Sequence, residues 1–404
     1  MRTLVIILIV AAVLIAGAVF YLVATTPDAA APVRVPLSPA QRALLGHVPE
    51  QADLFALIPT AARLHATLLA NPVTMEPLLR WTHEHELPRP WMLGGADVAV
   101  WKVGKKTSYA VRLDPFRALL VRAWLLVAST AEARWEGSTL IMHEAVPPAR
   151  TVNLEPLLRL ANGLPEADLL VVQRESARGA FPPIGRPAVS SVRITPAEAV
   201  IVSRAATNEV GEQHEMRPRF PSSAILAAAF ASPPRILGDL NRLVGTRIDA
   251  LVDDGGSIAL YGVDTGGLLP RPRGVIVIPA DEEGRRQFEE IRPYAELVGE
   301  TRDLGDRLAV SFDRTSMPLY IKDAAVPAAW PATRWAMRLD PSRLVPILRK
   351  VGDSRGLRFA SPRISRAARD LKGWIDALEH AHSIEAAAAV SGGVEELRVR
   401  VASK

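Results

Sequence analysis

The stretch GGADVAVW, residues 94–101, decides the fold because it recurs as GGSIALY at residues 255–261 when one gap is allowed. Further matched segments follow in the same order in both parts of the chain. Four matched pairs, Gly94/Gly255, Val111/Ile276, Leu140/Leu308 and Pro165/Pro331, are separated by 161, 165, 168 and 166 residues. Chance similarity would not keep these separations so even, and a repeat bears on every later inference about the fold. We therefore predict a duplicated body.

Each copy contains segments typical of strands and of helices. The copies open with a turn before a buried strand, at Pro49–Ile58 and at Pro221–Ala228. We expect them to close with hairpins, at Ser191–Arg204 and at Ile384–Val401. Helices laid on such strands predict an α+β fold with largely antiparallel sheets.

Two helices are predicted to begin at repeated Asp-Pro pairs, Asp114-Pro115 and Asp340-Pro341. Aspartate accepts hydrogen bonds from the amides of the first turn, and proline suits the first helical position. One apolar stripe of the first of these helices is expected to face the core: Phe116, Leu119, Leu120, Ala123, Trp124 and Val127.

The N-terminal part is predicted to be a membrane anchor, residues 1–24, followed by a tether rich in proline and alanine, residues 25–39. Leu4–Ala24 holds twenty-one residues without a charge, and as a helix it would measure roughly 31 Å, enough to cross a bilayer. A cleaved signal peptide is the alternative, because the small residues at Ala16–Ala18 would suit a peptidase. The body is then divided into a first α+β repeat at 40–207, a polar linker at 208–218 and a second, similar α+β repeat at 219–404.

The charge pattern favours a location outside the cytoplasm. Arg2 precedes the anchor and Asp28 is the first charge after it, so the N-terminus is expected in the cytoplasm and the body in the periplasm of a bacterium, with a single pass through the inner membrane. The absence of cysteine excludes disulfides, thiolate metal sites and cysteine catalysis. The net charge of +5 is spread over interleaved acidic and basic residues, which predicts no nucleic-acid partner.

The best metal-ligand candidates are His83 and His85, which would share one face of an extended segment, where neutral imidazoles suit zinc or copper. With Glu84 or Glu86 they would give a tethered metal-dependent hydrolase. The competing interpretation is an exposed loop whose histidines are incidental. A second pair, His380 and His382, is expected near the end of the last helix, where histidine suits the helix dipole.

Other candidates for chemistry have structural explanations. His65 lies on an apolar helical face and is interpreted as a core histidine, while His143 has no visible third member of a site. Asp253-Asp254 fits a turn, and Glu282-Glu283 fits the first turn of a helix. The chain lacks the serine-nucleophile, phosphate-loop, dinucleotide and zinc-protease motifs, so no cofactor is predicted and a non-catalytic role is favoured.

The layout of anchor, proline-rich tether and duplicated body, with openings such as Pro49–Leu54 and Pro165–Leu169, resembles uncharacterised bacterial single-pass membrane-anchored envelope proteins. The resemblance implies a location and no reaction. The sequence leads us to expect a binding or scaffold module with the membrane as one partner, through Leu4–Ala24, and an envelope protein or a lipid as another. A groove between similar domains is a common place for an apolar ligand.

Overall fold

The structure is a computed structural model of the chain. It describes residues 33–75, 93–104, 106–128, 133–142, 150–174, 187–207, 216–231, 256–264, 271–311, 313–330, 333–353, 375 and 378–404. The fold is α+β with mostly antiparallel strand pairing, as predicted. The predicted anchor Leu4–Ala24 lies outside the described residues. Within the described ranges, none of the helices has the length and apolarity that a bilayer crossing requires.

The chain divides into two compact units. The first holds Met1–Pro196 with Ile201–Ala206, and the second holds Ala197–Val200 with Thr207–Lys404. Strand β8 (Glu198–Ala206) therefore contributes residues to both units.

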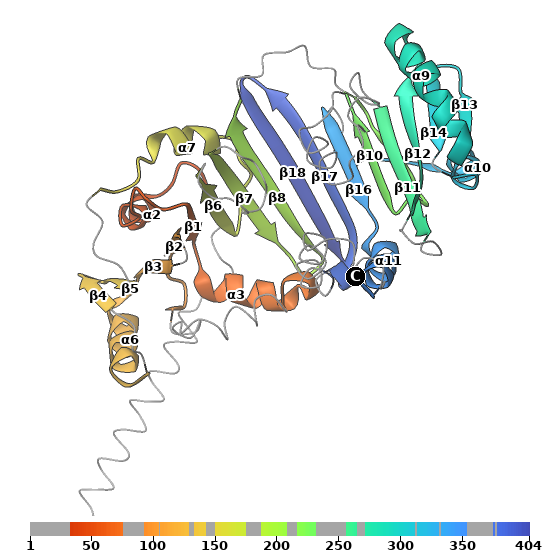
Figure 1. Cartoon of the computed structure of the whole chain (residues 1–404). Coiled ribbons are helices and arrows are strands. Elements are labelled where there is room, and N and C mark those ends of the chain that lie inside the picture. Colours follow the sequence, from red (N-terminus) through yellow and green to blue (C-terminus); the bar gives the residue numbers. More distant parts are fainter. Residues whose placement is uncertain are drawn as a thin grey trace, which may run out of the picture. The chain divides into compact units, whose positions relative to one another are not determined.

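In the first unit the strands follow the order β8-β7-β6-β1-β2-β3-β5-β4 (Figure 1). Besides β8, these are β1 (Leu54–Ile58), β2 (Val98–Val103), β3 (Lys106–Arg112), β4 (Ala133–Glu136), β5 (Thr139–Met142), β6 (Leu169–Gln173) and β7 (Ala188–Ile194). The helices are α2 (Pro39–Leu45), α3 (Ala61–Ala70), α6 (Pro115–Ala128) and α7 (Glu155–Ala161) among the residues described.

In the second unit the order is β18-β17-β16-β10-β11-β12-β14-β13. These strands are β10 (Leu226–Phe230), β11 (Gly256–Asp264), β12 (Arg271–Pro279), β13 (Thr301–Asp303), β14 (Arg307–Ser311), β16 (Trp335–Leu339), β17 (Ala381–Ser391) and β18 (Val394–Ser403). A separate ribbon pairs β9 (Arg219–Pro221) with β15 (Ala325–Pro327). The described helices of this unit are α9 (Glu282–Val298), α10 (Ser316–Lys322) and α11 (Pro341–Asp353). Figure 1 shows α9 lying beside β13 and β14.

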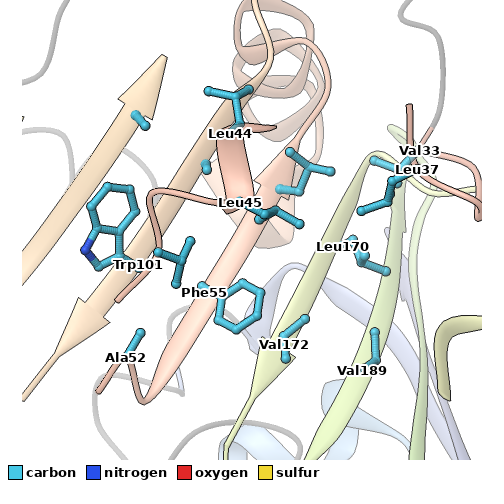
Figure 2. Packing of buried hydrophobic residues seen from close by; sticks show 14 of the residues in the cluster. Val33, Leu37, Leu44, Leu45, Ala52, Phe55, Trp101, Leu170, Val172 and Val189 are labelled. Atoms are coloured by element: carbon cyan, nitrogen blue, oxygen red, sulfur yellow. The ribbon is translucent and has the colours of Figure 1, made fainter. Parts of the chain in front are cut away.

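The first unit fills one face of its sheet with large apolar side chains. Figure 2 shows Phe55, Trp101 and Val172 on the strands, facing Leu44 and Leu45 of the covering helix α2. Each of these side chains is at most 4% exposed, so burial of this face is nearly complete. At about 25 cal/mol per Å² of apolar surface, such a cluster is a principal source of stability for the unit.

The last part of the predicted tether, from Val33 on, belongs to the folded body. Val33 is only 3% exposed and Leu37 only 4%, and both belong to the core beneath α2. The backbone amide of Val33 donates to the carbonyl oxygen of Ala167 at 2.8 Å. The prolines in this segment favoured the interpretation as a tether, because proline restricts the backbone and removes a hydrogen-bond donor. The apolar residues that alternate with them pack into the core of the first unit instead.

The predicted core-facing stripe of α6 is wrong in part. Leu119 is 64% exposed, and the helix instead buries Ala118 and Val121 against β3 and β5. This helix is apolar around most of its circumference, so helical spacing alone allowed more than one buried face. The buried side also includes Arg117, whose guanidinium donates to the Asp114 carboxylate at 2.9 Å.

The predicted helix starts and hairpins are confirmed. The Asp114 carboxylate accepts from the amides of Phe116 and Arg117, and the Asp340 carboxylate accepts from the amide of Ser342. Both hairpins are present, as β7–β8 and β17–β18, and the second turns at Gly392-Gly393. The φ angles of these two glycines are 56° and 74°, a region that favours glycine.

Candidate functional site

The second unit contains a pocket of about 760 Å³ over the strands β10, β11 and β12. Ala227, Ala229 and Ala259 belong to its floor, and Phe220 and Tyr320 stand on the covering side. A volume of this size is in the range of small-ligand sites, which are usually concave and mostly apolar. All residues that line this pocket lie between Met216 and Ala325, within the second unit.

The floor owes its shape to the run LAAAF in β10. Ala227 pairs with Ala259 of β11, and Ala229 pairs with Ser257 of β11 on one side and Ala336 of β16 on the other. Alternate residues of a strand share one face of the sheet, so small side chains form a continuous surface there. The bulk above this surface comes from the cover, chiefly from Phe220, Tyr320 and Trp330.

The corresponding positions in the first unit carry large side chains. Strands β1 and β10 hold the same place in their strand orders, and both have five residues. Phe55 pairs with Trp101 of β2, where the second unit pairs Ala227 with Ala259. Leu57 pairs with Leu170 of β6, where the second unit pairs Ala229 with Ala336. On the face that carries the pocket, the second unit therefore has alanine at places where the first unit has bulky residues.

Beside this floor the second unit has two charged residues at places where the first unit has valines. Ala227 of β10 pairs with Arg338 of β16, which pairs in turn with Glu385 of β17. The buried Nη1 atom of Arg338 and the buried Oε2 atom of Glu385 have no hydrogen-bond partner among the described residues. In the first unit the same two places hold Val172 and Val189.

The rim of the pocket is polar and carries more positive than negative charge. Arg217, Arg219 and Arg307 line it together with Asp306 and Asp323. The guanidinium of Arg307 lies 3.7 Å from the Asp306 carboxylate. Arginine guanidinium groups remain protonated at all ordinary pH values, so the rim keeps its cations.

The carboxylate of Asp323 is occupied by hydrogen bonds from neighbouring serines. It accepts hydrogen bonds from the Ser222 hydroxyl and from both the amide and the hydroxyl of Ser223. Burial of this carboxyl raises its pKa, but the serine hydrogen bonds outweigh that effect and the pKa is lowered. Asp323 is thus ionised at neutral pH, and it holds the end of α10 to the turn before β10.

The candidates for metal ligation from the sequence are not brought together by the described structure. His83 and His85, with Glu84 and Glu86, lie outside the described residues. No cluster of three or more candidate ligand side chains of the kind that could hold a metal occurs within the ranges that are described. His382 lies on β17, one residue beyond the first residue of that strand.

The remaining sequence candidates are structural where they are described. His65 is half-buried on α3, and burial lowers its pKa. Glu283 lies in the first turn of α9, as predicted, and accepts from Arg286 and Gln287. His143 and Asp253-Asp254 lie outside the described residues. The pocket was missed, although the alanine run at 227–229 was a usable signal.

Comparison with protein-family models, with curated proteins and with solved structures finds no significant match for this chain.

Proposed function

We propose that this protein is a non-catalytic binding module of the bacterial envelope, tethered to the inner membrane, that holds an apolar ligand in the pocket of its second unit. The observation that carries the proposal is the alanine floor beneath a pocket of about 760 Å³. Folding alone would favour a filled face, because each buried apolar side chain adds stability. A face built from alanine depends on the side chains that cover it for its bulk, and the ligand would be held where this cover leaves the pocket open.

We further propose that the two units are a tandem repeat. Their strand orders match place for place, from β8 and β18 at one end to β4 and β13 at the other. Asp114 begins α6 and Asp281 begins α9 at corresponding points, after β3 and β12. A duplicated scaffold offers a simple route to a binding site: one copy keeps a filled core while the other exchanges bulk for a pocket.

The location follows from the sequence. Leu4–Ala24 would anchor the chain in the inner membrane by a single pass, with the N-terminus in the cytoplasm and the body in the periplasm. A body held beside a bilayer is close to a large supply of apolar molecules, so a lipid-derived ligand is the natural choice. An envelope protein bound at the same surface is the alternative.

The proposal is tested by gentle extraction of the full-length protein, followed by native mass spectrometry and titration with hexadecan-1-ol. We expect a lipid-sized adduct or saturable binding of the alcohol. Ala229→Leu should reduce binding at least about tenfold, because the added bulk would occupy the floor. The matched control Ala123→Leu makes the same change at an exposed position on α6 and should bind like the wild type. A protein that neither carries a lipid nor binds the alcohol would refute the apolar-ligand function.

A further inference from the structure

We infer that the ligand of the pocket is a single-chain amphiphile with an anionic head group, carboxylate or phosphate, and that Arg217 and Arg219 hold this head group. The inference rests on the proposed function and adds the chemical class of the ligand. It is carried by the placement, the exposure and the unused charge of these two arginines.

The two arginines lie on one side of an extended segment. Arg217 and Arg219 are exposed, whereas Pro218 and Phe220 between and after them are buried. Residues two apart in an extended chain point the same way, so both arginine side chains lie on the side of the segment opposite the buried Phe220. Both line the pocket, and Phe220 anchors the segment in the core beneath them.

Their charges are not used within the described part of the protein. Neither Arg217 nor Arg219 has a carboxylate partner there. Exposed arginines of the same unit are commonly paired, as on α9, where Arg286 lies 2.8 Å from Glu290. Two neighbouring cations that find no counter-charge among the described residues repel each other, and an anion bound between them would relieve that repulsion.

The acidic residues of the rim do not compete for this role. The Asp306 carboxylate lies beside Arg307 on the turn before β14, and the Asp323 carboxylate is occupied by serine hydrogen bonds. Guanidinium groups bind carboxylates and phosphates through paired hydrogen bonds. An amphiphile would therefore place its anionic head at the exposed arginines and its chain on the alanine floor.

The test compares hexadecanoate with hexadecan-1-ol, which has the same chain and no charge. Both are titrated into the full-length protein in neutral detergent, with partition into protein-free micelles subtracted. We expect the acid to bind at least about tenfold more tightly than the alcohol, since hydrogen bonds to charged groups are the stronger class. Inorganic phosphate at millimolar concentration should not displace the acid, because it lacks the chain.

The variants separate this inference from general electrostatics. Arg217→Gln/Arg219→Gln should abolish the preference for the acid and leave the affinity for the alcohol unchanged. Arg271→Gln/Arg314→Gln removes the same charge from exposed positions that do not line the pocket, and it should keep the preference.

Each other outcome has a definite meaning. Equal binding of acid and alcohol by the wild type would overturn the anionic head group and leave the proposed function standing. Displacement of the acid by inorganic phosphate would show a site for a free anion and overturn the amphiphile. Binding of neither compound would end both proposals.

Discussion

The two units have the same strand order, but the corresponding faces of their sheets are packed in opposite ways. In the first unit the bulk stands on the strands, with Phe55 and Trp101 under the short helix α2 (Figure 2). In the second unit the strands carry alanine at those places. The large side chains, Phe220 and Tyr320, come instead from the segments that cover the strands. Close packing can be reached from either side, but a flat alanine floor tolerates gaps that interdigitated large side chains do not.

The difference extends to polarity. The first unit continues its filled face across Val172 and Val189, which are nearly inaccessible to solvent. The second unit sets Arg338 and Glu385 at those places, each with a buried atom that lacks a hydrogen-bond partner in the described structure. A face selected only for stability would not keep such atoms, because a buried polar group without a partner costs about 1–3 kcal/mol. The comparison therefore favours a stabilising role for the first unit's face and supports the binding role that we propose for the second unit's face.

The largest predicted effect is on the filled face. Phe55→Ala should lower the free energy of unfolding by about 3–5 kcal/mol, because the site is enclosed and cannot collapse into the space of the lost ring. Phe55 is 1% exposed. Urea denaturation of the full-length protein measures the change, and Tyr294→Ala, at a residue that is 74% exposed, is a control expected to stay within about 0.5 kcal/mol. A loss below about 1 kcal/mol for Phe55→Ala would break the comparison, since the first face would then be as loosely packed as the second.

A second prediction concerns the charges beside the pocket. Arg338→Val/Glu385→Val gives the second unit the first unit's residues and should raise the free energy of unfolding by about 1–2 kcal/mol, because it removes buried polar atoms without partners. Glu385→Val alone should be less favourable than the double change, since it leaves Arg338 without a neighbouring negative charge. Thermal denaturation of the three proteins decides the order. Destabilisation by the double change would mean that these charges support the fold.

Local chemistry is what the sequence predicted best. Asp114 and Asp340 begin helices, and Gly392-Gly393 turns a hairpin, because each depends on hydrogen bonds or backbone angles within a few residues. The alternation within strands likewise follows from the residues themselves. These features needed no knowledge of distant partners.

The strand register and the buried side of each helix could not be predicted from the sequence. The sequence matched Val111 to Ile276, but the strand pairing sets Val111 opposite Leu140 and Ile278 opposite Leu308. By strand pairing, Val111 takes the place in the first unit that Ile278 takes in the second. The sequence match differs from this by two residues, a shift that keeps every side chain on the same face. The buried side of α6 was ambiguous for a similar reason, since Leu119 and Val121 are equally apolar. The pocket depends on which alanines meet across β10, β11 and β16, and that is a property of the assembled sheet.

The smallest predicted effect concerns the contact between α2 and the sheet of the first unit. Burial raises the pKa of Asp97, beside β2, to about 6, although a hydrogen bond from Gln41 of α2 and the charge of Arg112 oppose the shift. A carboxyl whose pKa is higher in the folded state than in the unfolded state favours folding when protonated, so stability should fall as pH rises from about 4 to about 6. Asp97→Asn removes this decline.

Because the carboxyl is only half-buried, solvent screening limits the increase in the free energy of unfolding from Asp97→Asn at pH 7 to about 1 kcal/mol. The variant and the wild type should have similar unfolding free energies below pH 4. Subtracting the wild-type from the variant unfolding free energies, measured in urea across this range, cancels the other titrating groups. A difference that does not change with pH would mean that burial does not raise the pKa of Asp97 in the folded protein, and this part of the first unit would then be more open to solvent than the structure indicates.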